Sequence, residues 1–224
     1  MKKDLTFLLL IIALFAPFFV SDTVFEFYEN FNLEHGMIMS FIKFAILATL
    51  GEVIGLRIRT GKYIQKGFGI IPRAIVWGFL GLTIKMAFMI FAVGTPVFLE
   101  YLGLENATKV MKGSLGLSKL LVAFSISVAM NLIYAPVMMT LHKITDNHII
   151  NNGGTIRGFF KPFRFGEIII NLNWDVQWNF VFKKTIPFVI KKLTQLGLQK
   201  KKEGEEPNPK NLDVPFLILS LFGI

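Results

Sequence analysis

Long apolar runs constrain this chain more than any other feature of its sequence. Three runs reach the roughly 20 residues that a helix needs to cross a bilayer, and a shorter run precedes them. The four runs cover residues 5–20, 37–56, 74–99 and 117–141. We therefore predict an all-α membrane protein, a four-transmembrane-helix bundle whose short first span crosses a thin or locally pinched bilayer.

The composition argues against an ordinary soluble domain. Hydrophobic residues make up 53% of the chain and charged residues only 17%, below the roughly 25% usual for soluble domains. Mean hydropathy is +0.57. The 24 phenylalanines are too many for one small soluble core and fit a surface that faces lipid. The sequence has no cysteine, which excludes disulfides and thiolate catalysis.

The apolar run at the N-terminus has two interpretations. Lys2 and Lys3 followed by an apolar stretch also begin a secretory signal peptide. However, the bulky sequence 16–20 lacks the small residues of a cleavage site, and further apolar runs follow. An uncleaved signal anchor is therefore favoured over a cleaved peptide.

Charge alternates between the segments that join the runs. Segment 21–36 carries four acidic residues and no Lys or Arg, whereas segment 57–73 carries five basic residues and no acid. Segment 142–165 carries four basic residues against one acid, Asp146. The positive-inside rule then predicts a multi-pass protein with a cytoplasmic N-terminus. It assigns the formal net charge of +9 to loops near anionic headgroups rather than to nucleic acid.

The region after the fourth run has a different pattern. Residues 166–193 include a stretch in which apolar and amide side chains alternate, which is typical of a strand by period alone. A lone open strand cannot lie in hydrocarbon, so we predict an interfacial segment anchored by Trp174 and Trp178. Residues 1–193 then form the transmembrane domain, and 194–224 a polar linker with a short apolar tail.

Charged side chains inside the predicted spans are candidate functional groups. Lys85 lies eleven residues after Ala74, roughly 16 Å along a helix and near the bilayer middle. Glu52 lies about one turn from the basic segment 57–73. Both share a helix face with small residues, which let another helix approach closely. The sequence leaves two hypotheses open: an ion pair between Glu52 and Lys85, or separate hydration of each charge.

The fourth span adds an amide and a proline. Asn131 lies on a face of small and polar residues, where it either packs helices together or lines a polar path, the first being favoured. Pro136 cannot donate to the carbonyl of Leu132, so we predict a kink there. Glu52, Lys85 and Asn131 make up the candidate intramembrane polar site.

The sequence carries no strong motif for a metal, a cofactor or catalysis. His142, Asp146 and His148 are close in sequence, but in a predicted loop without further ligands at suitable spacing. A phosphate loop, a nucleotide fingerprint and a nucleophile elbow are all missing from the sequence. We therefore predict neither a metal nor a cofactor, and no enzymatic activity.

Between about residues 40 and 187, several marks follow one another in a set order. They are Gly51-Glu52 before the basic loop, Arg73 before Gly78 and Gly81, Asn131 before Ala135-Pro136, and Trp174–Phe180 before Pro187. This order resembles the Mpv-seventeen family of small integral membrane proteins of peroxisomes and mitochondria. That family usually has Asp where Glu52 stands, and its last helix is not visible after Lys191. The resemblance implies a helical membrane protein, sometimes proposed to form a pore for small solutes.

Two functions are compatible with these features. The polar groups in the spans favour pore-like permeation of a small solute, whose identity the sequence leaves unknown. The same small-residue faces also suit a non-transporting structural or assembly protein, because they pack helices without any path. The expected partners are the lipid bilayer and further copies in a homo-oligomer, without nucleic acid.

Overall fold

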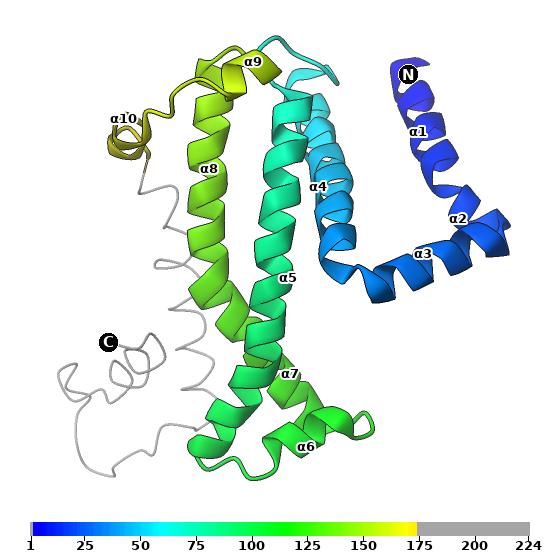
Figure 1. The fold of residues 1–224 in the computed structure, drawn as a ribbon, viewed down its shortest axis with the longest axis vertical. Coiled ribbons are helices and arrows are strands. Elements are labelled where there is room, and N and C mark those ends of the chain that lie inside the picture. Colours follow the sequence, from blue (N-terminus) through cyan, green and yellow to red (C-terminus); the bar gives the residue numbers. More distant parts are fainter. Residues whose placement is uncertain (1, 174–224) are drawn as a thin grey trace, which may run out of the picture. The chain divides into compact units, whose positions relative to one another are not determined.

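A computed structural model of the chain describes residues 2–173. Within that range the chain forms helices and no strand (Figure 1), so the predicted all-α class is confirmed. The predicted anchors Trp174 and Trp178, most of the interfacial segment 166–193, and the tail 194–224 lie outside the described residues.

Three helical stretches are long and apolar enough to cross a membrane. They are α4 (Gly36–Thr60), α5 (Ile70–Tyr101) and a continuous stretch, Leu117–Asn151. The last contains α7 (Leu117–Ala129), the π-helical turn η1 (Met130–Tyr134) and α8 (Ala135–Asn151). Each stretch contains one predicted span and extends beyond it, which fits a multi-pass membrane protein.

The predicted first span, 5–20, consists of two shorter helices. α1 covers Lys2–Phe15 and α2 covers Pro17–Val20. Pro17 has no N–H to continue the hydrogen-bond ladder of α1, and it suits the first position of a new helix. Within residues 2–173 only the three longer stretches meet the length expected of a span, so the fourth span stays a prediction.

The described residues divide into two compact units. Unit 1 comprises the chain up to Met86 together with Ile149–Lys161, and unit 2 comprises Ala87–His148 and the residues from Pro162. Helices α5 and α8 contribute residues to both units.

In unit 1, segment 21–36 was expected to be a loop, but most of it forms the helix α3 (Asp22–Glu34). The Ser21 hydroxyl accepts a hydrogen bond from the Val24 N–H at 3.4 Å, and Asp22 lies in the first turn, where the helix dipole favours an acid. Its four acidic side chains are exposed. Figure 1 shows α3 joining the far end of α2 to the start of α4.

Helices α4 and α5 are antiparallel neighbours in unit 1. The Ser40 hydroxyl donates to the Gly81 carbonyl at 2.8 Å. A methyl group on Gly78 would lie 2.5 Å from the Phe41 ring, and one on Gly81 would lie 2.7 Å from Cβ of Phe44. Glycine at these two positions therefore lets the two helices approach closely.

The predicted loop 142–165 is helical over its first part. Helix α8 continues to Asn151, so His142, Asp146 and His148 lie on a helix and not in a loop. A short helix, α9 (Ile156–Phe159), follows, and the Thr155 hydroxyl accepts from the Gly158 N–H at 3.0 Å at its start. The apolar run ended at residue 141, but a helix can continue through polar residues once it leaves the hydrocarbon.

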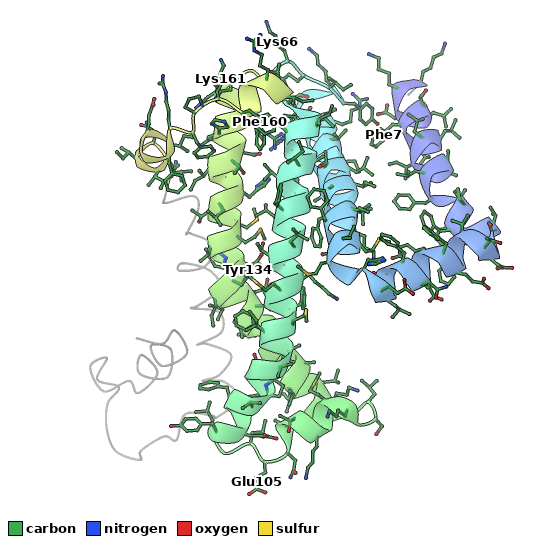
Figure 2. All side chains as sticks on the ribbon, in the orientation of Figure 1. Phe7, Lys66, Glu105, Tyr134, Phe160 and Lys161 are labelled. Atoms are coloured by element: carbon green, nitrogen blue, oxygen red, sulfur yellow. The ribbon has the colours of Figure 1, made fainter. Side chains whose placement is uncertain are left out.

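Unit 2 contains a short helix, α6 (Ala107–Lys112), after the loop that carries Glu105 (Figure 2). The Glu100 carboxylate accepts from the N–H and the hydroxyl of Thr108 at 2.9 and 2.7 Å. Buried Ala107 packs against Val122 and Ile126 of α7. Helix α10 (Phe165–Ile170) begins the predicted interfacial segment and packs Ile168 against Ile144 of α8.

Candidate functional site

Glu52, the acid of the candidate site, lies on α4 in unit 1 and is bound by two donors from α5. Its Oε1 accepts a hydrogen bond from the Trp77 indole N–H at 2.7 Å. Its Oε2 forms an ion pair with the Arg73 guanidinium. Arg73 and Trp77 are four residues apart, so they project from the same face of α5. The carboxylate therefore joins α4 to α5 at one level.

The Arg73 side chain is deeply buried, with 5% of its surface exposed. Its Nε donates to the Phe68 carbonyl at 2.7 Å, and its guanidinium lies over the Phe68 ring at 4.4 Å from the centroid. A buried charge is tolerated only when it is paired and hydrogen-bonded. Arg73 meets that requirement through the carboxylate, the carbonyl and the ring face.

The structure pairs Glu52 with Arg73 and not with Lys85. A methyl group on Gly36 would lie 3.9 Å from Cε of Lys85, so Lys85 is level with the start of α4. Glu52 lies 16 residues further along α4, about 24 Å away at 1.5 Å per residue. Lys85 is exposed, and within residues 2–173 it has no ion pair or hydrogen bond. The structure therefore does not form the Glu52–Lys85 pair, because the register of α4 against α5 keeps the two residues apart.

A second lysine within a predicted span, Lys43, lies on α4 and has partners on α3. Lys43 Nζ donates to Asn32 Oδ1 at 2.8 Å and lies 4.9 Å from the centroid of the Tyr28 ring. Both partners belong to α3. Helical side chains lean toward the N-terminus of their helix, so Lys43 reaches back along α4 to the acidic helix α3.

Asn131, the third candidate, belongs to unit 2 and lies in η1. Its Nδ2 donates to the Ser127 carbonyl at 2.8 Å, so the amide bonds to its own helix. Pro136 follows η1 by two residues, and a π-helical turn is one way in which a helix accommodates an interruption of its ladder. Figure 1 shows α7 and α8 running in different directions on either side of η1.

A groove of about 530 Å³ lies beside Glu52 on the surface of unit 1. Three small residues of α4, Ala48, Gly51 and Gly55, line it together with Trp77 and Arg59. Within the described residues, a methyl group on Gly51 or Gly55 would have no atom within 4 Å. This face of α4 therefore has room for another chain segment, in contrast to the glycine contacts that α5 makes with α4.

A second polar cluster in unit 1 joins α1 to the end of α4 and to the loop that follows α4. Asp4 Oδ1 accepts from Arg57 Nε at 2.7 Å and from the Tyr63 hydroxyl at 3.0 Å, and Oδ2 accepts from Arg57 Nη2 at 2.9 Å. Phe7 stacks on the Tyr63 ring at 4.3 Å. The hydrogen bonds from Arg57, and then that from Tyr63, hold the pKa of Asp4 well below its usual range. Burial, and then Asp4, raise the pKa of Tyr63.

The histidines considered as metal ligands lie in unit 2 and face different surroundings. His142 Nε2 is 3.7 Å from Asp146 Oδ1, four residues on along α8. The His148 ring is buried and stacks on Phe163 at 4.4 Å between centroids. His148 therefore serves the packing of unit 2, and these three residues do not gather around one point.

Sequence reasoning identified Glu52 but missed its partners. Arg73 and Trp77 continue the i, i+4 series that includes Gly81, so they share the face of α5 that meets α4. That spacing was the available signal. Asp4 was also missed, since no local pattern relates it to Arg57, 53 residues along the chain.

Comparisons of the chain with protein-family models, with curated proteins and with solved structures found no match. The resemblance to the Mpv-seventeen family accordingly stays a prediction.

Proposed function

We propose that this chain is a multi-pass membrane protein with a structural or assembly role and that it does not transport a solute. The observation that supports this proposal is the environment of Glu52, whose carboxylate oxygens accept from Arg73 and Trp77. A carboxylate held in this way is neutralised by its partners and fixes how two helices meet, a role often found for buried polar groups.

The position of Lys85 supports the same proposal. It is level with Gly36, where the chain passes from the acidic helix α3 into α4. If α4 crosses the bilayer, its start lies near one surface, and Lys85 reaches headgroups by extending its flexible stem. Its charge then requires no water-filled path through the membrane.

The groove beside Glu52 supports an assembly role. Small residues at membrane helix surfaces allow a second helix to approach closely, and Gly51 and Gly55 have the four-residue spacing that such contacts use. We propose that a helix from a second copy of this chain lies against this face, in a homo-oligomer. The bulky double variant Gly51→Leu/Gly55→Leu should then shift the purified protein to a smaller assembly on a native gel.

The matched control for that experiment is Gly94→Leu, at a position on α5 where a methyl group would also have no atom within 4 Å in the described residues. This variant should leave the assembly unchanged. Equal migration of wild type and the double variant would contradict an assembly surface at the groove.

Permeation of a small solute is the second candidate, favoured by the exposed charge of Lys85 and the exposed amide of Asn131. Proteoliposomes loaded with solutes of graded size distinguish the two functions. The structural role predicts that wild type and Lys85→Ala release solutes no faster than empty vesicles. Solute-selective release that Lys85→Ala alters would establish permeation instead.

A further inference from the structure

One end of unit 1 gathers a cluster of basic residues. We call it the basic end and define it by nine basic residues: Lys2, Lys3, Arg57, Arg59, Lys62, Lys66, Arg73, Arg157 and Lys161. Among the described residues of unit 1, the acids at this end are Asp4 and Glu52, and these are paired with Arg57 and Arg73. These nine basic and two acidic residues give the basic end a formal charge of +7.

Two segments far apart in sequence are locked together at the basic end. A methyl group on Gly154 would lie 2.6 Å from the carbonyl of Gly67, and one on Gly69 would lie 3.0 Å from Cα of Gly154. Both Gly69 and Gly154 adopt positive φ, 71° and 67°, which favours glycine. Backbone contact at this distance fixes the loop that carries Lys66 against the segment that carries Lys161.

The side chains on these two segments are arranged toward the outside. Lys62, Lys66, Arg157 and Lys161 are exposed, and the two loops themselves, 61–69 and 152–161, contain no acid. Large apolar side chains, Ile64 and Phe160 among them, are also exposed, by 71% and 75%. Figure 2 shows Lys66, Phe160 and Lys161 on the same end of unit 1.

We propose that the basic end binds the headgroups of anionic phospholipids. The charge is complementary, because each lysine or arginine near an anionic membrane surface favours binding. The mixture of cations with exposed isoleucine and phenylalanine suits the boundary between headgroups and acyl chains. The location is also suitable, since these loops end helices that are long and apolar enough to cross a membrane.

The test is lipid selectivity of the full chain in phosphatidylcholine membranes. The association of spin-labelled phosphatidylglycerol relative to spin-labelled phosphatidylcholine should exceed one and fall as salt rises, because screening weakens exposed charges. In Lys66→Gln/Lys161→Gln this ratio should fall toward one, because two of the exposed cations are removed. Inorganic phosphate should not compete, because binding requires a headgroup held at the membrane surface.

The matched control is Lys109→Gln/Lys112→Gln, which removes two exposed lysines of α6 in unit 2. It should retain the preference for phosphatidylglycerol. Equal loss in both double variants would reduce the effect to overall charge and overturn the proposal, as would a wild type without any preference. Displacement of the lipid by an RNA oligonucleotide at physiological salt would also overturn it, by assigning the surface to nucleic acid.

Discussion

At the scale of single residues, two acids of unit 1 are paired with arginines that lie far away in sequence. Glu52 pairs with Arg73, and Asp4 pairs with Arg57. Each pair has a neutral hydrogen-bond donor beside it, Trp77 or Tyr63 respectively. The two clusters together connect α1, α4, the loop after α4, and α5.

The Asp4 cluster predicts a stability that depends on pH. Because the folded pKa of Asp4 is lowered, its contribution is present above the ordinary aspartate pKa of about 3.9 and is lost as the pH falls through the lowered value. The difference in melting temperature between wild type and Asp4→Asn should thus be constant from neutral pH to about pH 5 and shrink below about pH 4. A difference that grows toward acid would contradict the pairing.

The sequence could identify Glu52 as a charged residue inside a span, because hydropathy alone marks it. It could not identify Arg73 as the partner, because Arg73 was counted with the basic loop outside the membrane. The predicted pair of Glu52 with Lys85 rests on the small residues that share a helix face with each of them, but register depends on where glycines meet bulky side chains. Gly78 and Gly81 set that register through contacts with Phe41 and Phe44.

At the scale of elements, the contact between α4 and α5 depends on two glycines that leave no space for a side chain. Substituting Gly78 by Ala adds a methyl group 2.5 Å from the Phe41 ring. Overpacking costs about 1–3 kcal/mol, partly offset by the better helix propensity of Ala, about 1 kcal/mol. Gly78→Ala should therefore lower the unfolding free energy measured by denaturant titration in detergent.

Gly94→Ala, on the same helix, provides the control for that measurement. Its added methyl group meets no atom within 4 Å in the described part of the chain, so only the propensity gain of up to about 1 kcal/mol remains. Gly78→Ala as stable as Gly94→Ala would mean that α4 and α5 are not in close contact at Gly78.

The apolar runs predicted the three long helices because hydrophobic length is a direct requirement for crossing a bilayer. They did not predict α3, because acidic residues after an apolar run were interpreted as a loop. An amphipathic helix at an interface has the same composition, and its N-cap at Ser21 was the local signal. The continuation of α8 to Asn151 was missed for a related reason, since hydropathy marks the edge of the membrane and not the end of a helix.

At the scale of the whole molecule, unit 1 has ends of opposite charge. The basic end contains the N-terminal residues and the loop after α4, while α3, with four exposed acids, lies at the other end of α4. From this asymmetry the positive-inside rule predicts that the basic end faces the cytoplasm.

This orientation is testable because the chain has no cysteine. Single variants Lys3→Cys, Lys62→Cys and Glu29→Cys can be labelled in intact cells with a maleimide that does not cross membranes. Glu29→Cys should react from outside, whereas Lys3→Cys and Lys62→Cys should react only after the membrane is opened. Labelling of positions 29 and 62 from the same side would contradict the topology of unit 1.

The central claim is that the ion pair between Glu52 and Arg73 ties α4 to α5. Two double-mutant cycles in the full chain, measured as unfolding free energies in detergent, test it most directly. Glu52→Gln combined with Arg73→Met should give a coupling energy of about 1–3 kcal/mol, as contacting residues do. Glu52→Gln combined with Lys85→Met should be additive within about 0.5 kcal/mol, because the two sites are distant. Coupling to Lys85 with none to Arg73 would contradict the account.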